Sequence, residues 1–345
     1  MGMKHGILTE ILQFAVINNA SDVHFSSNEQ PMLRIKGEFK KVDIPPLEDD
    51  TLREELMSLL NEEQRRQFNE YHEVDLAITM EDIGRFRINI YEHFRGIAGA
   101  FRIFPNTIRS LDDLMLPKVV RQMVNKPKGL ILVTGPTGSG KSTTLAAMVN
   151  EVNANRRLHI ITIEDPAEYI HTPLQGIIHQ RELGFHTKSF SRALMNCLRE
   201  DPDVILVGEM REIETVTLAL HAAETGHLVL STLHTNTAAE SVDRIVDIFP
   251  AEKQQQIRVM LANTLVGILA QRLVPMAFKN DRIALVEILV ATPAIRNLIR
   301  EGKSYQIPSA IQTGADVGMQ TFERSFEKLR KNNLISPQLK LSDFV

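Results

Sequence analysis

The sequence predicts an α/β protein in which a domain with a mainly parallel sheet follows a smaller α+β domain and precedes a helical region. From residue 129 onward, apolar runs of strand length alternate with helical stretches, which is the pattern of a parallel sheet. Before residue 110, short strand-like and helical segments are mixed. The length of 345 residues fits about two domains.

The first 110 residues predict a mixed α+β domain that has no catalytic motif of its own. Apolar residues recur at helical spacing over residues 7–16, and leucines do so again over 49–68. Short strands are expected at VHFS, PMLRIKG and EFKKVD. In GRFRINIY, residues 84–91, the apolar side chains alternate with arginine and asparagine, so they share one face of a strand.

The second domain is predicted from four apolar runs, LILVT, LHIITIE, DVILVGE and HLVLSTLH, each separated from the next by a helical stretch. Helical periodicity dominates from Thr237 to Arg272 and again from Pro293 onward. We therefore expect a first domain at residues 1–110, a linker with two prolines at 111–128, an α/β core at 129–290 and a helical C-terminal region at 291–345.

The stretch GPTGSGKST has the spacing of a phosphate-binding loop and stands between a predicted strand and a run of helix formers. Its glycines let backbone N–H groups point at one anion, and the following helix adds the positive end of its dipole. Lys141 is expected to reach the β- and γ-phosphates, and the Ser142 hydroxyl suits Mg²⁺. The alternative, a glycine-rich turn without a ligand, fits the flanking strand and helix poorly. The residues expected to bind a nucleoside triphosphate are Gly135, Pro136, Thr137, Gly138, Ser139, Gly140, Lys141, Ser142 and Thr143.

Two acidic residues follow predicted strands at the edge where ligands bind in open α/β sheets. Glu164 ends the run that begins at His159, and Glu209 follows the run DVILV. Hydrolysis needs a group that orients water and a second carboxylate for the metal. Either acid alone could be an ordinary polar strand end. Two of them beside a phosphate-binding loop indicate a catalytic site.

The run HLVLSTLH is expected to bring His227 and His234 to the same edge of the sheet. A histidine at such a place is more often a structural hydrogen-bonding group than a catalyst, so their role stays open. A zinc site is disfavoured because no third ligand stands at metal spacing.

Composition excludes several classes of protein. The net charge of −4 gives no basic field for nucleic acid or an acidic membrane, although local patches are possible. With a single cysteine, Cys197, the chain can form neither an internal disulfide nor a four-cysteine zinc site, which fits a reducing cytoplasm. The polar start of the chain argues against a signal peptide, and no apolar window is long enough to span a membrane.

Several motifs, in this order along the chain, resemble those of the type II/type IV secretion ATPase superfamily. GPTGSGKST, TIEDPAEY, LREDPDVILVGEMR and STLHTNTA resemble its Walker A, Asp-box, Walker B and His-box series. SDVHF, DRIVDIFP and AQRLVP extend the likeness over nearly the whole chain, and AIRNLIRE is particular to PilT-type pilus retraction ATPases. By this resemblance the chain is identified as a member of the retraction branch of the superfamily.

The resemblance implies a PAS-like N-terminal domain, a RecA-like ATPase domain, a hexameric ring and hydrolysis of ATP with Mg²⁺ at subunit boundaries. It makes Glu164 the catalytic base and Glu209 the Walker B acid that joins Ser142 on Mg²⁺. His227 and His234 would sense the γ-phosphate or couple it to the neighbouring subunit. Arg87 and Arg102 match arginines that reach the nucleotide, although a solvated face is the ordinary interpretation of strand arginines. The departure is Met195, where the family usually has an arginine.

These features predict a hexameric motor ATPase that drives type IV pilus retraction for twitching motility. The expected partners are copies of itself, an inner-membrane pilus platform protein and a related retraction ATPase, with no nucleic acid and no direct membrane insertion. Such a protein would be cytoplasmic, at the inner face of the bacterial inner membrane. The alternatives are a pilus assembly or type II secretion ATPase, which usually carries a four-cysteine zinc module, and a RecA-like nucleic-acid translocase, for which stacking aromatic stretches are lacking.

Residues 292–302, TPAIRNLIREG, predict a short helix with caps at both ends. Thr292 suits the N-cap, Pro293 the first helical position and Gly302 the left-handed stop. Its isoleucines and leucine are expected to pack on the body of the protein. Arg296 and Arg300 lie one turn apart on another side of the helix, where a solvated basic face is the ordinary interpretation. The resemblance of AIRNLIRE to the retraction family implies instead that this basic surface couples the motor to the pilus.

Overall fold

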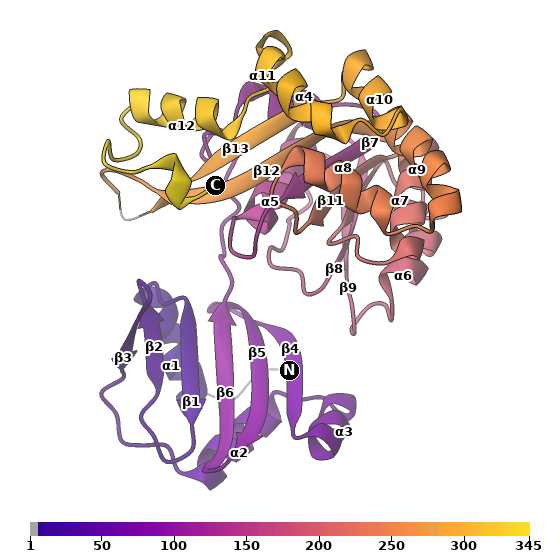
Figure 1. The fold of residues 1–345 in the computed structure, drawn as a ribbon. Helices are drawn as coiled ribbons and strands as arrows, with labels where there is room; N and C mark the ends of the chain where they lie inside the picture. The colour runs from indigo at the N-terminus through magenta and orange to yellow at the C-terminus, as the bar shows by residue number, and fades with distance from the viewer. Residues whose placement is uncertain (1–5, 280) are drawn as a thin grey trace. The chain divides into compact units, whose positions relative to one another are not determined.

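The computed structural model describes residues 6–279 and 281–345, which form two compact units that divide after Thr107. The first unit is built around an antiparallel sheet with strand order β3-β2-β1-β6-β5-β4 (Figure 1). Its strands are β1 (Asp22–Ser26), β2 (Met32–Ile35), β3 (Glu38–Lys41), β4 (Glu73–Met80), β5 (Gly84–His93) and β6 (Gly96–Ile103). Its helices are α1 (Ile7–Ile17), α2 (Asp49–Ser58) and α3 (Glu62–Tyr71).

The period-two pattern places one face of β5 in the core of this unit. Phe86, Ile88 and Ile90 are fully buried, whereas Arg87 is exposed on the other face. Helices α1 and α2 contribute Leu12 and Leu56 to the same core. The predicted α+β arrangement of this part of the chain is confirmed, and its PAS-like character stays a prediction.

The second unit is built around a larger sheet with strand order β13-β12-β7-β11-β10-β8-β9. Its strands are β7 (Gly129–Thr134), β8 (His159–Glu164), β9 (Ile177–Glu182), β10 (Val204–Val207), β11 (Leu228–Leu233), β12 (Leu265–Pro275) and β13 (Arg282–Val290). Its α-helices are α4 (Lys118–Val124), α5 (Lys141–Asn155), α6 (Phe190–Cys197), α7 (Ile213–Glu224), α8 (Ala238–Asp247), α9 (Ala251–Thr264), α10 (Pro293–Arg300), α11 (Ile307–Thr313) and α12 (Phe322–Lys331). Short 3₁₀ helices are η1 (Ser304–Gln306), η2 (Ala315–Val317) and η3 (Leu341–Asp343).

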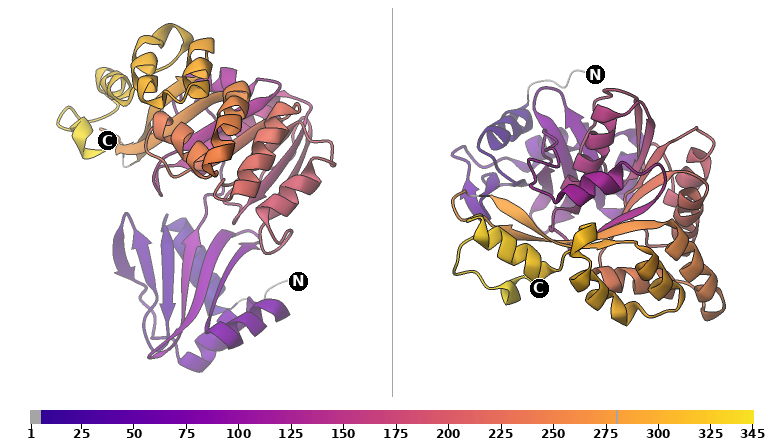
Figure 2. Two further views of the ribbon diagram at one scale, coloured as in Figure 1. Left: turned by 45° about the vertical axis from the view of Figure 1, so that its right-hand side comes forward. Right: turned by 90° about the horizontal axis from the view of Figure 1, so that it is seen from above.

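The central strands of this sheet are parallel and covered on both faces, as the apolar runs predict. Strand β11 pairs with β7 and β10, and β8 pairs with β10 and β9, all in parallel. Helices α6 to α11 pack on one face of the sheet and α4 and α5 on the other (Figure 2). Strands buried on both sides have apolar side chains in both directions, so their sequences read as continuous apolar runs. The predicted α/β fold is confirmed.

The prediction of helix up to Arg272 was wrong for its last residues. Helix α9 ends at Thr264, and β12 starts at Leu265 and runs beside β7. Residues 265–271 are nearly all buried between β7 and β13, so their apolar side chains face both layers. A short apolar run of this kind fits either a buried strand or a buried helix by pattern alone.

Residues 111–128, expected as a linker, contain helix α4, whose Val120 and Val124 are fully buried in the core of the second unit. Cys197 is also fully buried, on α6, and burial raises the pKa of its thiol to about 12. Among the described residues, no helix combines the length and apolar character that a membrane crossing requires.

Candidate functional site

The phosphate-binding loop joins the carboxyl end of β7 to the start of α5, which is the context that its sequence predicts. Gly135 and Gly140 both have positive φ, 144° and 86°. A side chain at Gly135 would collide with the Ser139 hydroxyl and with the main-chain oxygen of Gln271. The tip of the loop, residues 136–138, is exposed, while Ser139 is buried.

Lys141, the first residue of α5, is folded back over the loop. Its Nζ donates hydrogen bonds to the main-chain oxygens of Gly135 at 2.8 Å and Pro136 at 3.0 Å. Burial lowers the pKa of Lys141, and the nearby carboxylates of Glu168 and Glu209 oppose that shift. The ammonium group is therefore held by neutral carbonyl groups that a phosphate oxygen could replace.

The next two residues of α5 contact the segment that follows β8. The Ser142 hydroxyl donates to Glu168 Oε1 at 2.9 Å, and the Thr143 hydroxyl and the Tyr169 hydroxyl lie 2.8 Å apart. The hydroxyl expected to bind Mg²⁺ thus already stands beside a carboxylate. Ser142 can keep that donor bond when its oxygen binds a metal, because the two interactions use different parts of the hydroxyl.

Glu164 is the last residue of β8, and its carboxylate is held by neutral donors. Oε1 accepts hydrogen bonds from the Thr162 hydroxyl at 2.7 Å and from Gln180 Nε2 at 3.3 Å. Burial, only partly offset by these two bonds, raises the pKa of Glu164 to about 7. A carboxylate with a pKa near the working pH suits a group that takes a proton from water.

Glu209 follows β10 and has a more polar environment. Its Oε2 lies 2.8 Å from Arg211 Nε and 3.8 Å from His234 Nε2. Burial and the nearby Lys141 ammonium lower the pKa of His234, more than Glu209 raises it. His234, Glu209 and Lys141 are therefore grouped at the carboxyl ends of β7, β10 and β11.

His227 does not lie at this edge, so the expectation that both histidines share one edge was wrong. It precedes β11, and its main-chain oxygen accepts a hydrogen bond from Gly129 at the start of β7. A six-residue strand spans about 20 Å, so His227 and His234 stand at opposite ends of β11. Nδ1 of His227 donates to the main-chain oxygen of Ala222 at 2.9 Å, near the end of α7. Its observed contacts are those of a helix-capping residue.

Arg87 and Arg102 lie side by side on β5 and β6 of the first unit, where they are register partners. Arg102 Nε is 3.1 Å from Asp22 Oδ1, and both arginines are exposed. The structure thus brings these two predicted residues together on one surface. They belong to a different unit from the phosphate-binding loop.

Sequence reasoning missed four side chains that contact the site: Glu168, Tyr169, Gln180 and Gln271. The first two stand in TIEDPAEY and Gln271 in AQRLVP, both of which were singled out as motifs. Gln180 Nε2 also donates to the main-chain oxygen of Tyr169 at 2.9 Å, which ties this segment to Glu164. Gln180 on β9 has no local signal, because its contacts are made only when β9 pairs with β8.

The residues present fit a nucleotide and Mg²⁺. The loop has the backbone of a phosphate cradle, and the buried hydroxyl of Ser139 has no hydrogen-bond partner among the described residues. In the part of the chain that the structure describes, no group of three His, Cys, Asp or Glu side chains could hold a metal alone. Mg²⁺ sites commonly use one or two protein ligands together with phosphate oxygens and water, and Ser142 and Glu209 offer oxygen atoms of that kind.

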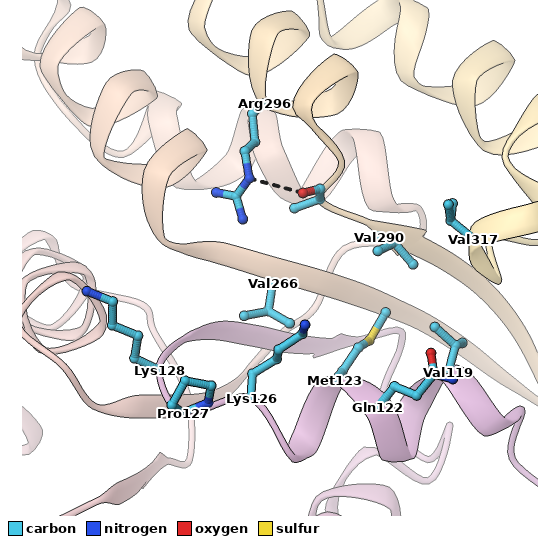
Figure 3. A pocket seen from close by; sticks show the side chains of 11 residues that line it. Val119, Gln122, Met123, Lys126, Pro127, Lys128, Val266, Val290, Arg296 and Val317 are labelled. Carbon is cyan, nitrogen blue, oxygen red and sulfur yellow. Dashed lines mark hydrogen bonds between the residues drawn. The ribbon is translucent and has the colours of Figure 1, made fainter.

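A pocket of about 430 Å³ lies elsewhere in the second unit, at the opposite ends of β7 and β12 (Figure 3). Val119, Met123, Val266 and Val290 give it apolar walls, and Lys126, Lys128 and Arg296 supply cationic groups. The nucleotide-binding loop is not part of it.

Arg296 corrects the prediction made for helix α10. Thr292 caps the helix, Pro293 begins it and Ile295 and Ile299 are buried, all as predicted. Arg296, however, is not on a free basic surface, since its guanidinium donates to main-chain oxygens at the end of α9 and to one just before α10. The acceptors at the end of α9 are Ala262, Asn263 at 2.8 Å and Leu265 at 2.8 Å, and the one before α10 is Ala291 at 3.0 Å. Arg300, half-buried like Arg296, donates to the Asn263 side chain at 3.1 Å and to none of these carbonyls.

Comparisons with known proteins agree over nearly the full length of the chain. A family model described as type II/IV secretion system protein matches residues 2–332. The type IV pilus retraction ATPase PilT of Pseudomonas aeruginosa is 45% identical over 329 residues, 95% of each chain. A twitching motility protein of Neisseria gonorrhoeae is 48% identical over 89% of this chain and 82% of its own. A crystal structure of the pilus retraction motor PilT with bound ADP superposes with a TM-score of 0.89 at 45% identity, covering 97% of this chain and 96% of the other.

Proposed function

The chain belongs to the type II/IV secretion system protein family, and we propose that it is an ATPase motor that drives retraction of a type IV pilus. The observation that carries the ATPase part is the grouping of Lys141, Ser142, Glu164 and Glu209 at one edge of the parallel sheet. The similarity to retraction ATPases over 95% of both chains supports the pilus part.

In the proposed reaction, backbone N–H groups of the loop bind the phosphates of ATP, and Lys141 moves from the Gly135 and Pro136 carbonyls to the β/γ oxygens. A bound Mg²⁺ would neutralise charge on these oxygens, with Ser142 and Glu209 as the residues that would hold it. Glu164 takes a proton from the attacking water, whose oxygen bonds to the γ-phosphorus as the bond to the leaving ADP breaks. A pKa raised to about 7 makes Glu164 a stronger base than an ordinary glutamate.

The cation that stabilises the reacting γ-phosphate is proposed to come from the first unit of a neighbouring subunit, through Arg87 and Arg102. Such an arginine accelerates hydrolysis by about 10³ to 10⁵. His234 is proposed to sense the γ-phosphate, because Glu209 and Lys141 adjoin it. His227 is proposed not to contact the nucleotide, since it lies at the other edge of the sheet. It would contribute by stabilising the fold or by contacting a neighbouring subunit.

The proposed assembly is a homohexamer that works at the cytoplasmic face of the bacterial inner membrane. Its partners would be the pilus platform protein and a related retraction ATPase. Sizing the protein with and without ATP tests the ring. Mixing Arg102→Ala with Lys141→Ala subunits tests sharing of the site, because some boundaries in mixed rings regain both groups. Absence of any recovered activity in assembled mixed rings would place the arginines and the loop in one subunit.

Lys141→Ala is the test of the ATPase assignment. We expect it to abolish ATP turnover and to stop pilus retraction in cells, because the charge on the β- and γ-phosphates is no longer matched. Lys253→Ala, an exposed lysine on α9, is the matched control and should retain turnover. Normal ATP turnover by a folded Lys141→Ala protein would refute the ATPase assignment. If the wild-type protein hydrolyses ATP normally but does not support pilus retraction in cells, the result would favour a secretion ATPase.

A further inference from the structure

A buried amide lies directly behind the phosphate-binding loop. Gln271, on β12, is 1% exposed. It is hydrogen bonded to Thr144, which precedes it by 127 residues in the chain. Strand β12 runs parallel to β7 with Ala270 opposite Thr134, the last residue of β7. Gln271 is therefore the first residue of β12 beyond the end of β7, where the loop begins.

The amide uses both of its ends on the loop and its helix. Gln271 Nε2 donates to the main-chain oxygen of Ser139 at 2.6 Å, and Oε1 accepts from the Thr144 hydroxyl at 2.8 Å. The carbonyl of Ser139 can only accept, so it fixes the orientation of the amide. Nε2 also lies 2.9 Å from the place that a Cβ on Gly140 would occupy, so the loop is packed against it.

The direction of the Ser139 carbonyl matters for anion binding. Successive N–H groups can point at a phosphate only when the carbonyls between them point away, because a carbonyl oxygen repels an anion. A carbonyl turned into the protein needs a donor there, since a buried acceptor without a hydrogen bond is destabilising. Gln271 Nε2 supplies that donor.

We propose that Gln271 is a positioning residue that holds the Ser139 carbonyl inward and thereby keeps the loop in its phosphate-binding conformation. This inference rests on the proposed function, because it assumes that the loop binds ATP. Gln271 touches no phosphate itself and acts through Ser139 and Thr144. Loss of the donor should therefore weaken nucleotide binding more than it weakens the fold.

The first measurement compares fluorescent ATP binding to wild type, Gln271→Met and Thr144→Val. Gln271→Met keeps the length of the side chain and removes both hydrogen bonds, so we expect affinity to fall by about 10- to 100-fold. Thr144→Val removes only the bond to Oε1 and leaves the Ser139 carbonyl with its donor, so affinity should stay within about threefold. Thermal melting of each variant shows whether it is folded.

The second measurement uses Gln271→Glu, a variant that can be tested with and without the donor simply by changing the pH. When protonated, the new carboxyl group donates to Ser139 and accepts from Thr144, as the amide does; when ionised, it has no donor and repels the carbonyl. Burial raises the pKa of such a carboxyl group. Relative to wild type at the same pH, binding should be near normal at about pH 6 and at least about tenfold weaker at about pH 8.5.

The outcomes separate the inference from the proposed function. Failure of wild type to bind ATP would refute the function itself. Binding by wild type and its loss in Lys141→Ala, together with normal binding by folded Gln271→Met, would overturn only the positioning role. Should Gln271→Met fail to fold, a Gln271→Glu affinity that follows wild type at both pH values would overturn it equally.

Discussion

The two edges of the parallel sheet use the same kinds of side chain in different ways. At the amino edge, His227 and Arg296 donate to main-chain oxygens near the ends of helices α7 and α9. At the carboxyl edge, Ser142 bonds to Glu168, and Glu209 lies between Arg211 and His234. Carbonyl groups in the last turn of a helix lack intrahelical partners, so side chains that donate to them fix the end of the helix. Side chains paired with one another can exchange partners when a ligand arrives, which suits the group at the carboxyl edge to binding a nucleotide.

The largest effect that tests this contrast is expected from Glu164→Gln. Loss of the base should lower turnover by about 10² to 10⁴, while ATP affinity changes little because the amide keeps the size of the side chain. Glu209→Gln, in comparison, should weaken Mg²⁺-dependent binding of ATP. Steady-state hydrolysis and fluorescent nucleotide titration measure the two quantities. Undiminished hydrolysis by Glu164→Gln would remove Glu164 from the mechanism.

The next effect concerns how the free energy of unfolding depends on pH. The folded-state pKa of Glu164, about 7, lies above its ordinary value of 4.5. Below pH 4.5 Glu164 is protonated in both the folded and the unfolded protein, so it does not change the free energy of unfolding. As pH rises to about 7 the unfolded state releases it first, so the carboxyl group comes to cost the folded state about 3 kcal/mol. Glu164→Gln should therefore be more stable than wild type at about pH 8 and nearly equal at about pH 4.

Denaturant titration at the two pH values checks this sign. A stability difference that is independent of pH would show that Glu164 is not protonated in the folded protein near neutrality. The same protonation predicts that kcat/KM rises with pH through about 7, since only the ionised carboxylate can accept a proton.

At the amino edge the expected effects are on stability. Arg296→Ala removes the guanidinium from several carbonyls at the end of α9 and should lower the free energy of unfolding by about 2 kcal/mol. Arg300→Ala, one turn further along the same helix, loses one exposed bond and should cost about 0.5 kcal/mol or less. Equal values for the two variants would mean that Arg296 does not fix the end of α9. Retraction assays of Arg300→Ala then test the basic surface without disturbing the fold.

The smallest effect is expected for His227. His227→Gln should lower stability by about 1 kcal/mol, through the bond to Ala222, and leave ATP affinity unchanged. His234→Gln should change ATP affinity, because His234 adjoins Glu209 and Lys141. Nucleotide titration of both variants distinguishes the two edges directly. A clear loss of affinity in His227→Gln would show that the amino edge communicates with the nucleotide.

Local signals predicted the parts of the fold whose structure is determined locally. The four apolar runs became the central strands, and the glycine spacing with its flanking elements located the phosphate-binding loop. Strand β12 was missed because its burial on both sides comes from β7 and β13, neither of which is adjacent to it in sequence.

The site followed the same division. Lys141 and Ser142 belong to one motif, and the two acids stand at strand ends, so a local pattern is enough to propose them, and their roles stay predictions. The partners of Gln271 and Gln180 are distant in the chain or are created by strand pairing, so no local pattern marks them. His227 was misplaced because the length of β11 separates two residues that are close in sequence. Arg296 was misjudged because a charged residue on a helix surface is usually solvated, and the end of α9 that it covers is known only from the fold.

The burial of Cys197 has a practical consequence for measuring motion. Its thiol is the only one in the sequence and is fully buried, and its raised pKa keeps it in the unreactive protonated form. Maleimide dyes therefore need no cysteine-free background. New cysteines at Phe94 in the first unit and Phe278 in the second, both fully or largely exposed hairpin residues, would be labelled selectively. Fluorescence energy transfer between two such labels could then follow the separation of the units through a cycle of ATP turnover.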